Sequence, residues 1–309
     1  MKMTTAYITH NHCDKHDMGE AHPESPQRLG AIRDRLIAGQ LLDYLRCVEA
    51  LPATQAQLKA VHDSAYVDSI FAKAPEQGHI EIEADTLLMP HSLAAAVHAA
   101  GAVVQAVDLV MSGKMDNAFC AVRPPGHHAE IDRAMGFCFF NNIAVGAKHA
   151  LTHGGVKRVA IIDFDVHHGN GTEAIFKGDP NVLYASSYQH PFFPYADPGA
   201  SHDNIMHMPL EAGSGGQEFR TAMTDVLFPR LASFRPELIM ISAGFDAHKS
   251  DPMGQLRLED SDFQWITEQL VTMAEQYCQG RIVSVLEGGY HLDALGRCAF
   301  SHIRSLMKM

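Results

Sequence analysis

The stretch VAIIDFDVHHGNGT, residues 159–172, decides the fold that we expect for this chain. Its first four residues, 159–162, are apolar, which is typical of a strand buried on both faces of a parallel sheet. Asp163, Asp165 and His167 then occupy alternate positions, so their side chains leave an extended backbone on the same side. Carboxylates and imidazoles are good ligands for first-row metal ions. The stretch therefore predicts a zinc site at the carboxyl end of a parallel strand.

Length and composition describe an ordinary globular protein. The 309 residues are 46% hydrophobic and 19% charged, so we expect one α/β domain spanning 1–309. The formal net charge of −12 argues against a nucleic-acid partner and mildly favours cationic substrates.

The six cysteines lie far apart and form no Cys-x-x-Cys motif, and the N-terminus has no long apolar core, which together predict a cytoplasmic location. Polar residues interrupt the Ala/Val-rich segment 93–111, which predicts a buried helix and no membrane partner.

Short apolar runs alternate with helical patterns along most of the chain. This alternation predicts parallel βαβ units with helices on both faces of the sheet. Pro26 is expected to open a helix that stops at Gly39, and Thr54 with Gln57 forms a capping-box pattern for the next helix. The long irregular piece 188–204 is a candidate functional loop. The expected strands cover residues 6–9, 118–122, 159–162, 182–185, 238–242 and 282–286.

Polar clusters follow four of the expected strands. Besides the opening stretch, these are RPPGHHAE (123–130), AGFDAH (243–248) and EGGY (287–290). Ligands of open α/β sheets bind outside the carboxyl ends of the strands, so the four clusters are expected to form one site.

The residue types in these clusters match the needs of metal-assisted amide hydrolysis. A catalytic zinc takes three protein ligands and keeps one open position, and Asp165, His167 and Asp246 can supply the three. The adjacent pair His127 and His128 offers a base for water and an acid for the leaving amine.

Two further residues complete the expected site. Asp163 can fix one histidine of the pair through a hydrogen bond or can bind a second ion. Tyr290 follows Gly288 and Gly289, which give the backbone close access, and its phenol can donate to an oxyanion.

With these residues assembled, the sequence resembles the zinc-dependent histone deacetylase superfamily, which includes acetylpolyamine amidohydrolases and acetoin-utilisation proteins. The motifs HPESPQRL, RPPGHHA, GFCFFNN, DFDVHHGNGT, SAGFDAH and LEGGY span nearly the whole chain and are similar to those of the class II branch and its bacterial relatives. The resemblance implies an arginase/deacetylase-like three-layer α/β fold, with a mostly parallel central sheet, helices on both faces and the active site at the carboxyl ends of the strands.

The resemblance also implies a role for each matching residue. Asp165, His167 and Asp246 bind the catalytic Zn²⁺; His128 is the general base and acid; His127, held by Asp163, gives electrostatic help. Asn170 stands where class I enzymes have an aspartate that pairs with the second histidine, and Tyr290 keeps the phenol that class IIa enzymes lack. The implied ligands of a structural K⁺ are Asp163, Asp165, His167, Ser186 and Ser187. The implied substrate-binding residues are Asp85, Gly136, Phe137, Phe193, Met253, Gly288 and Gly289.

The implied activity is removal of acetyl or related acyl groups from acyl-lysine side chains of a peptide or protein by metal-activated water. An acylated polyamine or another small acyl-amine is the alternative substrate, although polyamine-specific eukaryotic relatives have a glutamate where this chain has Met253. The rim loop YQHPFFPYADPG is shorter than in eukaryotic class II enzymes and has Tyr195 where glycine is common, which leaves the substrate preference open. Two other hypotheses for the function remain. One is an arginase-like binuclear manganese hydrolase, which needs further aspartates in its metal motifs, and the other is a non-catalytic module that binds acyl-lysine.

Overall fold

The centre of the molecule is a single parallel sheet. The structure, a computed structural model, describes residues 3–199 and 202–309. Within these ranges the sheet has eight strands in the order β2-β1-β5-β10-β9-β6-β7-β8, and every neighbouring pair is parallel. The strands are β1 Thr5–Thr9, β2 Arg46–Glu49, β5 Asn117–Cys120, β6 Val159–Asp163, β7 Val182–Gln189, β8 Ile205–Leu210, β9 Leu238–Ala243 and β10 Ile282–Leu286. A separate antiparallel hairpin joins β3 Ile80–Glu83 to β4 Thr86–Leu88.

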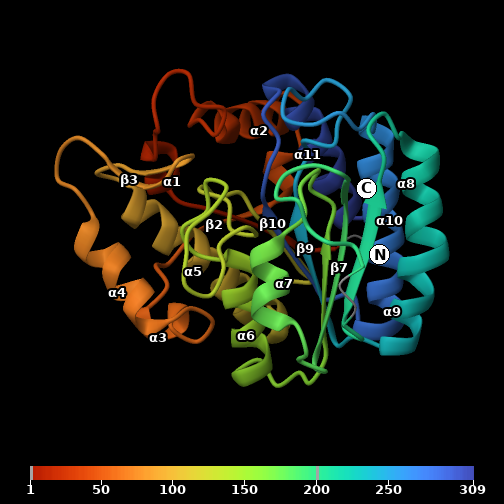
Figure 1. The fold of residues 1–309 in the computed structure, drawn as a ribbon. Coiled ribbons are helices and arrows are strands. Elements are labelled where there is room, and N and C mark those ends of the chain that lie inside the picture. The colour runs from red at the N-terminus through yellow and green to blue at the C-terminus, as the bar shows by residue number, and fades with distance from the viewer. Residues whose placement is uncertain (1–2, 200–201) are drawn as a thin grey trace.

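Helices cover both faces of the sheet (Figure 1). The longer ones, α5 Ser92–Met111 and α6 Asn142–Thr152, pack together on one face, while α10 Asp260–Cys278 and α11 Leu292–Leu306 pack on the other with α2 Gln27–Ala38. The remaining helices are α1 Asn11–Lys15, α3 Gln55–Leu58, α4 Ser64–Lys73, α7 Asn170–Phe176, α8 Gly216–Ala222 and α9 Phe228–Phe234, with short turns η1 Leu42–Tyr44 and η2 Met223–Leu227. The predicted three-layer α/β fold is confirmed.

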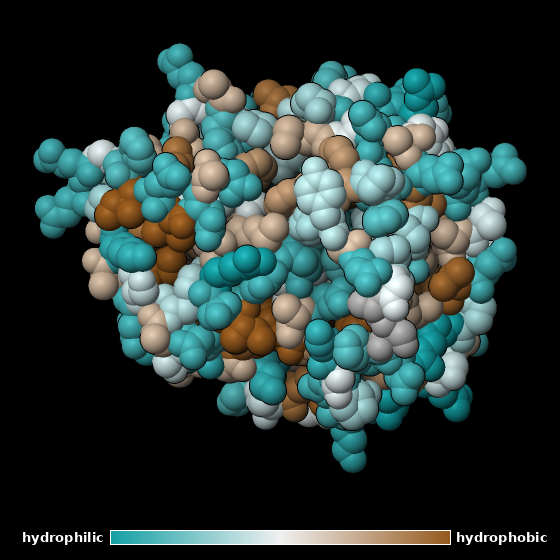
Figure 2. All heavy atoms as spheres, viewed as in Figure 1, coloured by the Kyte–Doolittle hydropathy of each residue, from teal (hydrophilic) through white to brown (hydrophobic). Residues whose placement is uncertain are grey.

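Burial on both faces explains the apolar strands. Every residue of β5, β6, β9 and β10 is buried, because each strand has neighbours on both sides and helices above and below. Helix α5 is long and apolar enough to cross a membrane by length and composition, but 61% of that window is buried inside the protein, where the helix contacts the sheet and α6. On the face shown in Figure 2, hydrophobic residues form separate patches among hydrophilic ones.

The predicted elements are present, and the two edges of the sheet were missed. Pro26 caps α2, Gly39 ends it, and Thr54 and Gln57 form the expected capping box. Strand β7 continues to Gln189, four residues beyond the expected end, and neither β2 nor β8 was predicted. Edge strands have one neighbour and stay partly exposed, so their sequences, RCVE and IMHMPL, lack a continuous apolar run.

Candidate active site

The four polar clusters meet because their strands are neighbours. The central strands lie in the order β5, β10, β9, β6, so the segments that follow them open at one edge of the sheet. A cavity of about 260 Å³ opens there. Its lining residues are Asp85, His128, Gly136, Phe137, His167, Phe192, Phe193, Met253 and Tyr290. The structure thus brings most of the predicted site residues to one cavity.

The predicted metal ligands converge at the floor of this cavity. Asp165, His167 and Asp246 are all buried, and each offers a ligand atom within 4.8 Å of the other two. His167 Nδ1 lies 3.0 Å from Asp165 Oδ1 and 3.4 Å from Asp246 Oδ2.

The alternate positions of these residues predicted an extended backbone, but the backbone that holds Asp165 and His167 is not a strand. Strand β6 ends at Asp163, and the next turns are shaped by the carboxylates themselves. The Asp165 amide donates to Asp163 Oδ1 at 3.1 Å, and the His167 amide donates to Asp165 Oδ1 at 2.9 Å. The side chains still converge because each carboxylate fixes the residue two positions later.

The three side chains suit a divalent cation. Asp246 Oδ2 is buried and accepts no hydrogen bond from the residues that the structure describes. Burial and the nearby charge of Asp165 raise the pKa of Asp246 to about 7, because two carboxylates lie close together in a buried site. Burial lowers the pKa of His167, but the neighbouring carboxylates of Asp165 and Asp246 outweigh it and raise that pKa to about 10. The arrangement therefore attracts positive charge, which a metal ion bound by two carboxylates and an imidazole provides.

His127 is held in its charged form. Its Nδ1 donates to Asp163 Oδ2 at 2.9 Å, and the Tyr184 hydroxyl donates to the same oxygen at 2.9 Å. Burial lowers the pKa of His127, but the carboxylates of Asp163, Asp165 and Glu287 outweigh it and raise the pKa to about 10. A fixed imidazolium thus lies beside the metal ligands, with its ring centroid 4.0 Å from that of His128.

His128 is held in the opposite state. Asn170 Nδ2 donates to Glu130 Oε1 at 2.6 Å, which fixes the amide so that Asn170 Oδ1 faces His128 Nδ1 at 2.8 Å. The Nδ1 position therefore carries the proton, and Nε2 keeps a free lone pair. Burial and the neighbouring His127 and His167 hold the pKa of His128 well below its ordinary value. A neutral imidazole with a free Nε2 at the cavity is a general base.

Tyr290 presents a neutral phenol to the cavity. Burial holds its pKa well above the ordinary value, although the nearby Arg28 guanidinium lowers it. The Arg28 carbon Cζ lies 4.9 Å from the centre of the Tyr290 ring, and Arg28 Nε donates to the Gly289 carbonyl at 2.7 Å. The Tyr290 amide donates to Asp251 Oδ2 at 2.7 Å. Tyr290 is therefore fixed from two sides with its O–H available as a donor.

Aromatic rings wall the cavity. Phe137 has φ 69 and faces Tyr290 edge-on at 6.0 Å, while Phe193 faces His128 edge-on at 5.2 Å. Gly136 precedes Phe137, and a Cβ there would collide with the His128 ring. Phe192 stacks on His167 at 5.5 Å between ring centroids. The walls are apolar and the floor is polar.

The rim carries a carboxylate. Asp85 lies in the turn between β3 and β4 and accepts from the Thr86 hydroxyl at 2.8 Å. Met253, on the opposite segment of the lining, has its amide held by Asp251 Oδ1 at 3.0 Å. Both predicted rim residues therefore line the cavity.

Several expected residues lie outside the cavity. Gly288 and Gly289 are not among the lining residues; the Gly288 amide donates to Asp165 Oδ2 at 2.8 Å, so Gly288 supports a metal ligand, while the Gly289 carbonyl accepts from Arg28 Nε. Ser186 pairs with Asp163 in the β6–β7 register, and its buried hydroxyl has no hydrogen-bond partner in residues 3–199 and 202–309. Ser187 follows it in β7 and is also buried.

The two extra histidines of the metal motifs do not join the metal ligands. His168 Nε2 lies 2.7 Å from Glu173 Oε2, and His248 Nε2 lies 3.0 Å from Asp260 Oδ1. Among the described residues, His167 with its two aspartates is the only such group at the cavity floor. This arrangement favours one ion over the pair that an arginase-like site needs.

The residues that support the site without having been predicted include Arg28, Glu130, Phe192 and Glu287. Glu287 accepts from the Gly126 amide at 2.7 Å, from the His127 amide at 3.2 Å and from the Ser242 hydroxyl at 3.0 Å. The sequence signal for Glu287 was its position directly after the buried strand β10, because a carboxylate buried there needs polar partners. Arg28 carried no such signal, because its contacts arise between segments far apart in the chain.

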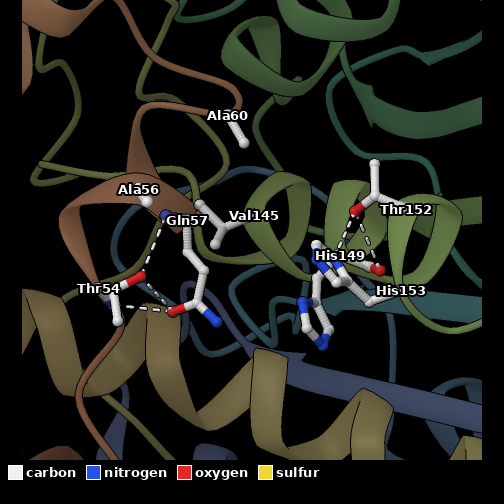
Figure 3. A pocket seen from close by; sticks show the side chains of 8 residues that line it. All are labelled: Thr54, Ala56, Gln57, Ala60, Val145, His149, Thr152 and His153. Atoms are coloured by element: carbon white, nitrogen blue, oxygen red, sulfur yellow. Dashed lines mark hydrogen bonds between the residues drawn. The ribbon is translucent and has the colours of Figure 1, made fainter.

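A second hollow lies between α3 and α6, lined by the residues shown in Figure 3. Its polar side chains bond to one another: Thr54 with Gln57, and Thr152 with His153. Helix α6 begins beside the segment that carries His127 and His128, where Asn142 Nδ2 donates to the Pro124 carbonyl, and the hollow runs along the helix from Val145 to His153. The hollow therefore contains none of the converging groups of the active-site cavity.

Comparisons with known proteins agree with this geometry. Residues 22–306 match the model of the histone deacetylase domain. The chain is 37% identical to a histone deacetylase-like amidohydrolase of Pseudomonas aeruginosa, over 92% of this chain and 77% of that protein. It is 37% identical to the mouse polyamine deacetylase HDAC10, over 94% of this chain, and 34% identical to the type-2 histone deacetylase 2 of Dictyostelium discoideum, over 99% of it. It spans 46% and 21% of those two longer proteins.

A solved structure shows the same fold. The crystal structure of the HDA15 HD domain superposes with a TM-score of 0.93 at 33% sequence identity, covering 99% of this chain and 88% of that one. The family match and the solved fold both cover nearly the whole chain. The chain therefore belongs to the histone deacetylase family and is a hydrolase that acts on amides.

Proposed function

We propose that this chain is a zinc-dependent amidohydrolase that removes acetyl, or a related acyl group, from the side-chain amine of acylated lysine. The observation that carries the proposal is the cavity of about 260 Å³, which combines aromatic walls with a polar floor. An acylated lysine has a linear apolar stem and a polar amide at its end, so its stem matches the walls formed by Phe137 and Phe193, and its amide matches the floor.

Each floor residue has a distinct chemical task. When Asp165, His167 and Asp246 hold Zn²⁺, the ion supplies a Lewis acid for the amide carbonyl and a lowered pKa for water. His128 Nε2 takes the proton from the attacking water and passes it to the leaving amine. Tyr290 donates its phenol proton in a hydrogen bond to the oxyanion.

Asp163 and the serines of β7 form the second part of the proposal. The Asp163–His127 pair keeps a positive charge near the developing oxyanion. We place K⁺ at Asp163, Asp165, His167, Ser186 and Ser187, and the unpartnered Ser186 hydroxyl supports this placement.

Peptide acyl-lysine is favoured over acylated polyamine by the rim. Asp85 offers a carboxylate to the backbone amides of a peptide at the cavity mouth. Met253 adds no charge to the lip, whereas a polyamine brings further amines that a second carboxylate would recognise. Because the mouse relative is named a polyamine deacetylase, acetylated polyamines are included as substrates in the test below.

The test is acetate release by the purified chain from matched acetyl-lysine peptides and acetylated polyamines, with and without a chelator. We expect hydrolysis of the peptides that the chelator abolishes and added zinc restores. Tyr290→Phe should lower kcat about 10²- to 10³-fold without changing the zinc content. Tyr277→Phe is the matched control, because Tyr277 lies in the last turn of α10, which leads to the amino end of β10 and so lies away from the cavity.

Two outcomes would contradict the proposal. Peptide binding without acetate release would favour the non-catalytic binding module. Unchanged hydrolysis in Tyr290→Phe and His128→Ala would exclude the proposed mechanism.

A further inference from the structure

A second cluster of metal-ligating side chains lies behind the active site. It joins His168, in the loop after β6, to Glu173 in α7 and His207 in the edge strand β8. His168 follows the catalytic ligand His167 but faces a different set of side chains. His167 contacts Asp165, Asp246 and Phe192, whereas the ring of His168 lies against Tyr184, Tyr188 and His207.

The donor atoms of the cluster converge on one oxygen. Glu173 Oε2 lies 2.7 Å from His168 Nε2 and 3.4 Å from His207 Nε2, and all three ligand atoms lie within 4.8 Å of one another. Donors bound at 2.0–2.2 Å to a tetrahedral ion are about 3.4 Å apart. The His207 distance already matches this value, and the shorter His168 distance is a hydrogen bond through the proton that an ion would replace.

One of these nitrogens makes no hydrogen bond within the part of the chain that the structure describes. It is His207 Nε2, which is buried, and the His207 side chain is only 6% exposed. Its other nitrogen, Nδ1, lies 2.9 Å from the Tyr188 hydroxyl. Metal-bound histidines commonly use the second ring nitrogen in this way, because the outer bond fixes the ring while the inner lone pair binds the ion. Burial lowers the pKa of His207, which keeps this lone pair available at neutral pH.

The remaining features of the cluster favour a first-row divalent ion. Two imidazoles and one carboxylate suit Zn²⁺ and its neighbours, whereas Ca²⁺ and Mg²⁺ prefer oxygen ligands. His168 is fully buried, while the Glu173 side chain is 15% exposed, so an ion would keep access to water for its fourth ligand.

Two other histidine-containing clusters do not meet these conditions. The rings of His10 and His98 stack at 3.8 Å and 14°, so their in-plane lone pairs run parallel and cannot meet at one ion. In the cluster of His248 and Asp260, the carboxylate already accepts from Arg297 Nε at 2.7 Å, which places a fixed positive charge where an ion would bind.

We infer that His168, Glu173 and His207 form a second binding site for a zinc-like divalent cation, separate from the catalytic centre. An ion there joins α7 and the edge strand β8 to the loop that carries His167. Since β8 pairs with β7 alone among the described strands, this link adds a second attachment for the edge of the sheet. The role is structural and does not depend on the proposed function.

The test counts zinc per chain by elemental analysis after saturation of the full chain with Zn²⁺ and removal of excess. We expect two ions in the wild type and one in both His207→Asn and Glu173→Gln. Asp246→Asn should also keep one, since it removes only the catalytic ion. His12→Asn, a change in the stacked histidine cluster, is the control and should keep two. Zinc should raise the Tm of Asp246→Asn but not that of Asp246→Asn combined with His207→Asn.

Other results have defined meanings. One ion in the wild type and in Asp246→Asn, with none in His207→Asn, would support the second site while contradicting the catalytic one. An unchanged zinc content in both His207→Asn and Glu173→Gln, or loss of the second ion in His12→Asn, would overturn the inference.

Discussion

Replacing Gly288 by alanine adds one methyl group directly beneath the metal ligands. The closest clash of a Cβ at this position would be with Asp246 Oδ2, and the Cβ would also lie 2.6 Å from Asp165 Oδ2. Real Cβ contacts shorter than 3.0 Å are essentially never seen, so the Asp165 carboxylate must retreat by roughly 0.4 Å, about twice the ±0.2 Å tolerance of metal–ligand distances. The φ of Gly288 lies outside the left-handed region, so alanine fits the backbone and the effect arises at the carboxylates.

We expect Gly288→Ala to weaken zinc binding about 10- to 100-fold, the size of effect seen when groups that orient metal ligands are changed. This equals about 1.4–2.7 kcal/mol of binding free energy. Competition against a chromogenic chelator measures the affinity, and acetate release at limiting zinc should fall in parallel.

Gly30→Ala is the matched control. Gly30 lies in α2, and a Cβ there would meet no atom within 4 Å. This variant should keep the wild-type zinc affinity and gain about 0.5–1 kcal/mol of stability from the better helix former. If Gly288→Ala binds zinc as tightly as Gly30→Ala does, the reasoning about the ligand floor is refuted.

Three further predictions concern the base, the core and the rim. Glu130→Gln should lower kcat/KM about 10- to 100-fold and change the pH–rate profile, because the Asn170 amide is then free to turn and His128 loses its fixed tautomer; an unchanged profile would count against this link. His302 is buried with its pKa lowered to about 3, so the unfolded chain binds a proton below 6.5 that the folded chain does not, and stability should fall by about 1.4 kcal/mol per pH unit from 6.5 down towards 3. Urea unfolding at several pH values measures this slope, and His302→Gln should reduce it. Met253→Glu should raise kcat/KM for acetylated polyamines relative to acetyl-lysine peptide by about tenfold, since one added carboxylate at the lip contributes about 1.4 kcal/mol to binding a second amine; an unchanged ratio of the two kcat/KM values would contradict it.

Much of the fold follows from local sequence patterns. The apolar runs before Asp163, Ala243 and Glu287 predict strands, because a strand buried on both faces has an unbroken run of apolar residues. The edge strands β2 and β8 could not be predicted, because a strand that is partly exposed and paired on one side tolerates many side-chain types. Thus the centre of the sheet was predictable while its width was not.

The candidate site divides in the same way. Six residues of the site were predictable, because each lies in a segment that follows a buried strand and is rich in chemically active residues: Asp165, His167, Asp246, His127, His128 and Tyr290. The Asp163–His127 pair and the Asn170–His128 pair were also expected, and the structure places both within hydrogen-bond distance.

Only the tertiary structure decided how these groups are controlled. Glu130 turns the Asn170 amide and so selects the free nitrogen of His128. Glu287 holds the backbone of His127. His207 reaches His168 from an edge strand that the sequence did not reveal. The physical reason is that the burial of a strand and the types of its residues are visible within a short segment of sequence. Protonation states, and the contacts that orient the metal ligands and the base, depend on groups brought together across the sheet, which no local pattern records.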